Sequence, residues 1–117
     1  MFQFVRNIAI IAVTLLSCGA SFAEDEQSAN YMMPACRDFI NGGSDTGTFV
    51  QGVCVGTIAT IIALGRYADT HCAPPRVTNE QGLRVVIQYI DNQPARLHEK
   101  FGLLALEAMQ NAWPCKK

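Results

Sequence analysis

The sequence predicts an all-α fold, a small four-helix domain stapled by two disulfides. Three observations support this prediction. Four segments repeat apolar residues at the helical interval, turn and capping residues separate these segments, and four cysteines follow a predicted export signal. At 117 residues the chain has room for one domain.

The N-terminus has the pattern of a secretory signal peptide. One positive charge, Arg6, precedes the apolar run from Ile8 to Leu16, which is too short to span a bilayer. Ser21-Phe22-Ala23 then places small residues where signal peptidase binds. We therefore expect residues 1–23 to be removed and residues 24–117 to form a single soluble domain in the periplasm.

A second interpretation of this N-terminus stays open. Leu15-Leu16-Ser17-Cys18 approaches a lipobox, in which the cysteine is lipidated and becomes the first residue of the mature protein. The leucine before Ser17 fits that pattern poorly. A soluble protein is therefore favoured over a lipoprotein anchored at Cys18.

The first helix is predicted over residues 28–40 and ends at Asn41-Gly42-Gly43. Pro34 must either kink this helix or begin its more regular half. Its apolar face combines Met32, Cys36, Phe39 and Ile40. The next helix is expected to take its N-cap from Ser44, Asp45 or Thr46.

The second helix, predicted over residues 47–67, carries no charge from Gly47 to Gly65. Small residues recur along one side of it, at Gly52, Gly56, Thr60 and Ala63. Such a stripe allows close helix packing and is also found in membrane helices. We favour a central helix buried on most sides over a transmembrane span, and we expect Gly56 to be its least replaceable residue.

Two further helices follow. Thr78-Asn79-Glu80-Gln81 is a capping box that begins the third helix, whose buried stripe is Leu83, Val86, Ile87 and Ile90. Pro94 suits the first turn of the fourth helix, and Pro114 ends it. The expected buried line of the fourth helix is Leu97, Phe101, Leu104, Ala108 and Ala112.

Antiparallel packing of consecutive helices selects one disulfide pairing from three possibilities. Cys36 and Cys54 each lie nine residues from Asp45, so a hairpin brings them to the same level. The fourth helix returns to the start of the third, which brings Cys115 towards Cys72. We therefore predict Cys36–Cys54 and Cys72–Cys115 bonds, as suits an oxidising compartment.

Composition and spacing argue against several functions. Without Arg6 the mature chain has eight basic and ten acidic residues, and no basic stripe indicates nucleic-acid binding. A zinc site at His71 or His98 is disfavoured because no Cys-x-x-Cys or paired-histidine spacing is present. With all mature cysteines expected in disulfides, no catalytic group, metal or cofactor is predicted.

Three motifs in combination resemble the Rap/Tai family of type VI secretion amidase immunity proteins. They are Gly-x-Cys-x-Gly at residues 52–56, the Thr-Asn-Glu-Gln box at residues 78–81, and Trp-Pro-Cys at residues 113–115. The resemblance covers essentially the whole mature chain. It implies a periplasmic, helical and often homodimeric protein that binds a peptidoglycan amidase effector and blocks its active-site cleft, without being an enzyme itself.

A small periplasmic stress chaperone, or an orphan envelope binding protein, is the alternative. For the immunity function, two segments are candidate binding surfaces: the connection from Arg66 to Arg76, stiffened by Pro74-Pro75, and the turn from Asn41 to Gly47. The stiffer connection is favoured because a preorganised loop loses less entropy on binding. Its candidate contact residues are Tyr67, Asp69, His71 and Arg76.

Overall fold

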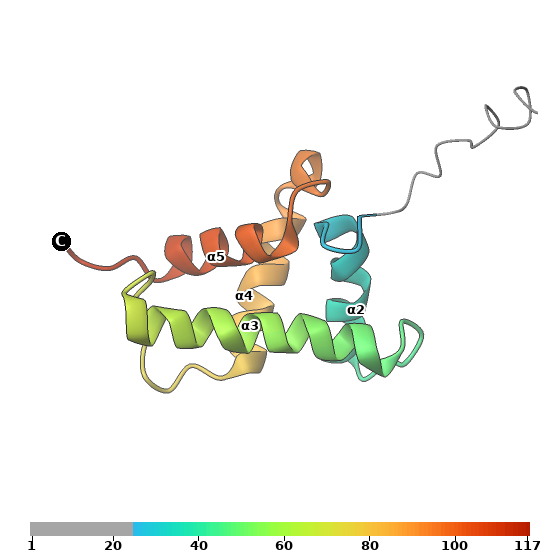
Figure 1. The fold of residues 1–117 in the computed structure, drawn as a ribbon, viewed down its shortest axis with the longest axis horizontal. Coiled ribbons are helices and arrows are strands. Elements are labelled where there is room, and N and C mark those ends of the chain that lie inside the picture. The colour runs from blue at the N-terminus through green and yellow to red at the C-terminus, as the bar shows by residue number, and fades with distance from the viewer. Residues whose placement is uncertain (1–24) are drawn as a thin grey trace, which may run out of the picture.

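The computed structural model describes residues 25–117, which fold into four α-helices and one 3-10 helix (Figure 1). These elements are α2 (Ala29–Asn41), α3 (Thr48–Ala68), α4 (Asn79–Asp91), η1 (Pro94–Arg96) and α5 (Phe101–Ala112). The predicted all-α fold is therefore confirmed. The predicted signal peptide and Cys18 lie outside the described residues.

Helix α4 lies behind α3 and α5 in Figure 1 and packs against the other three α-helices. Its apolar stripe supplies Leu83, Val86 and Ile90 to the core, as predicted. All four helices contribute to one continuous apolar cluster, whose largest fully buried side chains include Met33, Ile58, Leu83, Ile90, Leu104 and Met109.

Both disulfides have the predicted pairing. Cys36 of α2 is bonded to Cys54 of α3 with 5.7 Å between their Cα atoms. Cys72, just beyond α3, is bonded to Cys115 in the C-terminal tail with a Cα–Cα distance of 4.8 Å. Two cross-links thus join segments 18 and 43 residues apart in the sequence.

The helix starts follow local hydrogen bonding. The Ser28 side chain accepts a bond from the Tyr31 N–H at α2, and Thr78 accepts one from the Gln81 N–H at α4, as its capping box predicts. The predicted cap of α3 is wrong. Gly47 holds that position without a side-chain cap, because Thr46 bonds instead to the Asp38 carboxylate.

The predicted start of the last helix is also wrong. Pro94 begins only the short η1, and α5 begins at Phe101. The backbone between them is used by the N-terminal segment: Ala29 N–H donates to the Glu99 carbonyl, and Asn30 N–H donates to the Leu97 carbonyl. Residues 97–100 thereby satisfy the free N–H groups at the start of α2 instead of continuing a helix.

Helix α3 is buried on one side only, which contradicts the predicted central helix. Its buried face is Gln51, Cys54, Ile58, Ile61, Ile62 and Gly65. The predicted small-residue stripe lies on the opposite, solvent-exposed side: a Cβ atom added at Gly56 meets no atom within 4 Å. By length and composition α3 is apolar enough to cross a membrane, and 33% of its 18-residue apolar window is buried.

Close packing occurs at Gly65 instead of Gly56. A Cβ atom at Gly65 would lie 2.5 Å from the His71 Nε2 atom, inside the ring's van der Waals volume. His71 is itself buried, and its Nε2 atom lies 3.0 Å from the Ile61 carbonyl oxygen. This close contact makes Gly65 the glycine of α3 that tolerates a side chain least.

We predict that Gly65→Ala lowers the free energy of unfolding by about 1 to 3 kcal/mol, the usual cost of overpacking. The matched control is Gly52→Ala on the exposed side of the same helix, where a Cβ atom meets nothing within 4 Å. Because alanine favours helix by about 1 kcal/mol over glycine, this control should gain stability. Urea unfolding measures both; equal effects of the two changes would contradict the assignment of faces.

Candidate protein-binding loop

The segment between α3 and α4, residues 69–78, contains most of the predicted binding residues and is called here the α3–α4 loop. Asp69 ends α3 in the left-handed region at φ 51°. The Val77 N–H donates to the Pro74 carbonyl over 3.1 Å and closes a turn. Arg66 Nη2 of α3 donates to the Pro75 carbonyl over 3.0 Å. The loop is therefore closed by its own turn and tied to α3.

His71 anchors the loop in the core. Its side chain is 1% exposed, its ring covers Gly65, and its Nε2 atom lies 3.0 Å from the Ile61 carbonyl oxygen. A carbonyl only accepts hydrogen bonds, so Nε2 carries the proton in this arrangement. The prediction that His71 is a surface contact residue is wrong, because Gly65 leaves a space that the imidazole fills.

A second anchor joins the loop to the C-terminal tail. The Cys72 N–H donates to the Trp113 carbonyl over 2.8 Å, beside the Cys72–Cys115 disulfide. Gln110 of α5 donates to the Thr70 carbonyl over 3.1 Å. In Figure 1 the loop and the tail after α5 accordingly lie at the same end of the molecule.

The other three predicted contact residues remain accessible. Tyr67 is 89% exposed at the end of α3, and Asp69 and Arg76 are exposed on the loop. Tyr67 borders a hollow of about 380 Å³ whose lining also includes Val77 and Asn79. The loop thus presents two opposite charges next to the exposed tyrosine at the end of α3, and buried contacts hold its backbone.

The alternative segment, the turn between α2 and α3, is organised by one carboxylate. Asp38 accepts hydrogen bonds from the Thr46 N–H at 2.8 Å and the Thr46 hydroxyl at 2.9 Å. Gln51 adds a bond to the Gly43 carbonyl at 3.1 Å. The Thr46 backbone bond, more than its hydroxyl bond, holds the pKa of the Asp38 carboxyl below its usual value.

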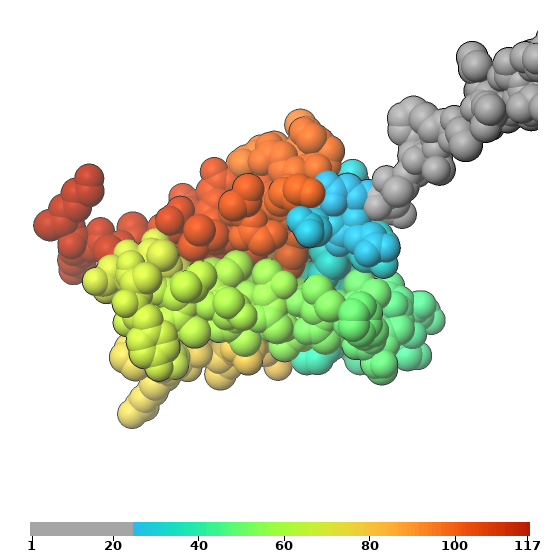
Figure 2. Space-filling view, in the orientation of Figure 1, coloured from blue at the N-terminus to red at the C-terminus, as the bar shows by residue number. Residues whose placement is uncertain are grey.

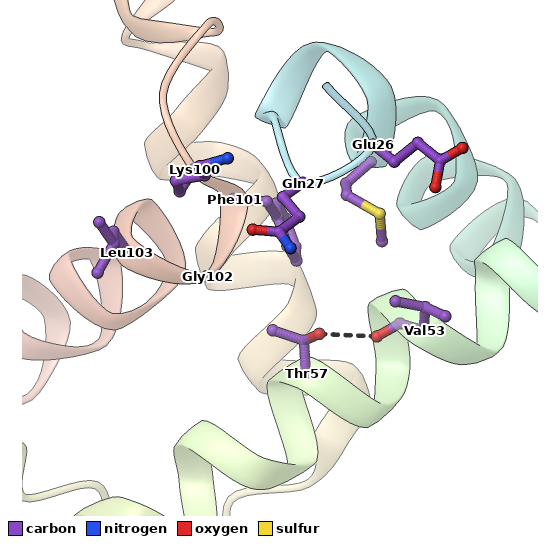
Figure 3. A pocket seen from close by; sticks show the side chains of 9 residues that line it. Glu26, Gln27, Val53, Thr57, Lys100, Phe101, Gly102 and Leu103 are labelled. Carbon is purple, nitrogen blue, oxygen red and sulfur yellow. Dashed lines mark hydrogen bonds between the residues drawn. The ribbon is translucent and has the colours of Figure 1, made fainter. Parts of the chain in front are cut away.

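A third surface feature is an apolar hollow of about 390 Å³ between α3, the start of α5 and the N-terminal segment. Figure 3 shows Val53 and Thr57 on one side and Phe101 and Leu103 on the other. The Thr57 hydroxyl donates to the Val53 carbonyl over 2.8 Å, so it does not point a free polar group into the hollow. The lining of this hollow is therefore suited to apolar contacts.

The described residues offer little for metal chemistry. Within residues 25–117, no three His, Cys, Asp or Glu side chains lie close enough to hold a metal ion. The Nε2 atom of His71 lies against the Ile61 carbonyl oxygen, and its Nδ1 atom is buried.

We expect the double change Cys72→Ser and Cys115→Ser to lower the free energy of unfolding by about 4 kcal/mol, the chain-entropy value for a loop of 43 residues. The His71 anchor should keep the protein folded. Calorimetry measures the loss, and amide exchange should quicken in residues 69–78 more than in α2. Unchanged exchange there would show that the disulfide does not hold the loop.

We expect Asp38→Asn to destabilise the protein at pH 7, with no difference from the original protein in strong acid. A carboxyl whose folded pKa is lowered contributes stability above its unfolded pKa, near 3.9, and this contribution disappears as pH falls through the folded pKa. Melting temperatures between pH 7 and roughly pH 2 test this. Asp45→Asn, an exposed neighbour in the same turn, is the control and should have a smaller effect at pH 7.

Comparison with known families identifies the chain. The model of the family described as Rap1a immunity proteins matches residues 12–115. Neither the curated proteins nor the solved structures contain a match to the sequence or the fold. Because the family match covers most of the chain, and agrees with the motifs at residues 52–56, 78–81 and 113–115, this protein belongs to the Rap1a family of immunity proteins.

Proposed function

We propose that this immunity protein acts in the periplasm, where it binds and inhibits a peptidoglycan amidase delivered by a type VI secretion system. Its membership in an immunity family supports binding to a toxic effector. The amidase target follows from the resemblance of its motifs to the Rap/Tai group. Inhibition occurs by occlusion of the effector's active-site cleft, and the immunity protein contributes no catalytic group.

The preorganised α3–α4 loop is the observation that supports this proposal most directly. Its backbone is held by the buried His71 ring, by the bond from Arg66 to the Pro75 carbonyl and by the Cys72–Cys115 disulfide. A loop fixed before binding loses little conformational entropy in the complex, which favours high affinity. Tyrosine and arginine side chains are frequent binding hot spots, and both Arg76 of the loop and Tyr67 at the end of α3 are exposed.

Export to the periplasm accounts for the N-terminal signal pattern and for the two disulfides. Peptidoglycan lies outside the cytoplasm, so protection requires the inhibitor there. Residues 1–23 have the pattern of a signal peptide, and the two disulfides of residues 24–117 suit an oxidising compartment. We also propose that the protein is a homodimer, as the resemblance implies.

The alternative function is a periplasmic stress chaperone. Exposed apolar side chains favour it, since Phe49 is 81% and Leu103 67% exposed. A chaperone binds many unfolded proteins weakly, whereas an immunity protein binds one folded effector tightly. The two functions are therefore separated by binding measurements.

We predict stoichiometric inhibition of an amidase encoded in the same genome. Arg76→Glu and Asp69→Asn should each weaken binding about 10- to 100-fold while leaving the melting temperature unchanged, since both residues are exposed and asparagine, like aspartate, tolerates the left-handed backbone at position 69. Asp45→Arg, in the turn between α2 and α3, is the matched control and should bind normally. Titration calorimetry and hydrolysis of peptidoglycan measure the two effects.

In cells, a version without residues 1–23 should fail to protect against an amidase sent to the periplasm. Equal weakening by Asp45→Arg would move the contact to the turn between α2 and α3. If no amidase of that genome binds, while acid-treated client proteins stay soluble in its presence, the chaperone function replaces the immunity function.

A further inference from the structure

The solvent-exposed side of α3 carries a continuous apolar line. Its members follow one another at intervals of three or four residues, so they project from the same side of a helix about 30 Å long. We call this line the α3 outer stripe, and it consists of Phe49, Val53, Gly56, Thr60, Leu64 and Tyr67. All six are exposed, and the uncharged run from Gly47 to Gly65 includes five of them.

The stripe has the same order of sizes in both directions. Two large side chains stand at each end, and the small Gly56 and Thr60 lie in the middle. A second copy of α3 turned by a two-fold rotation places Phe49 opposite Tyr67, Val53 opposite Leu64, and Gly56 opposite Thr60. A two-fold interface requires this self-complementarity, because each contact is made twice with the partners exchanged.

The centre of the stripe is prepared for close approach. No atom of the protein occupies the space beside Gly56, so a neighbouring helix can approach its backbone. The Thr60 hydroxyl already donates to the Gly56 carbonyl over 2.8 Å. Burying this hydroxyl in an interface therefore leaves no unsatisfied donor.

The area available agrees with a small stable interface. Phe49 and Tyr67, 81% and 89% exposed, together offer about 300 Å² on each copy. Val53, Leu64 and the 67% exposed Leu103 beside the hollow of Figure 3 extend this surface. The sum approaches the roughly 600 Å² per partner of the smaller specific interfaces. Figure 2 shows α3 uncovered along its whole length on the viewer's side.

We infer that the α3 outer stripe is the homodimer interface, formed by two antiparallel α3 helices that cross between Gly56 and Thr60. This inference rests on the homodimer proposed above and specifies its surface and register. The palindromic order and the absence of charge favour a second copy of this chain over an unrelated partner. It also places Tyr67 in the dimer interface and leaves Asp69 and Arg76 for the effector.

The first experiment measures the mass of the mature protein by light scattering across a dilution series. Thr60→Arg places a charge at the centre of the stripe and should raise the dimer dissociation constant at least 100-fold, with an unchanged melting curve for the monomer. Gln88→Arg, exposed on α4, is the matched control and should remain dimeric. Two results overturn the inference. One is a Thr60→Arg protein that remains dimeric, and the other is an original protein that is monomeric throughout the dilution series, even at millimolar concentration.

The register is tested by disulfide trapping. Oxidation of a mixture of Gly56→Cys and Thr60→Cys proteins should cross-link one of each, because these positions face each other in the antiparallel pair. Faster cross-linking of Gly56→Cys alone indicates a parallel pair and overturns the inference. Neither experiment contains an effector, so failure of this interface is distinguishable from failure of amidase inhibition.

Discussion

The two disulfides fix the position of α3, and the rest of the structure depends on this helix. The bond between Cys36 and Cys54 holds its first half on α2, and the bond between Cys72 and Cys115 holds the chain just beyond its end on the C-terminal tail. A domain of this size buries a limited apolar area, so covalent links supply much of the stability. With α3 fixed against α4, its other side stays exposed to solvent, as do Asp69 and Arg76 of the following loop.

Much of this fold was predictable because its signals are local. The capping side chains of Ser28 and Thr78 start α2 and α4, and the helical hairpin determines the disulfide pairing. The errors arise where distant segments decide the structure. The N-terminal segment uses the carbonyls of Leu97 and Glu99, which delays α5, and a helix that is apolar all round gives no periodic signal of its buried face.

The candidate binding loop shows the same division between local and distant signals. Exposure of Tyr67, Asp69 and Arg76 agrees with the sequence prediction, whereas the burial of His71 does not. That burial depends on Gly65, six residues earlier, whose missing side chain leaves room for the imidazole over the Ile61 carbonyl. A glycine near the end of a helix, followed by a polar ring in the next loop, was the available signal. The anchor it creates makes the loop rigid without using any exposed residue.

The glycines of α3 connect stability to assembly. Gly52 and Gly56 occupy open, exposed positions, where each costs about 1 kcal/mol of helix stability relative to alanine. Neither glycine has a positive φ, so no turn or left-handed backbone requires it. In a single protomer these residues only weaken the helix. In the proposed dimer, Gly56 allows close backbone contact with a second α3 and the flanking aromatic side chains leave water, which offsets the loss in the protomer.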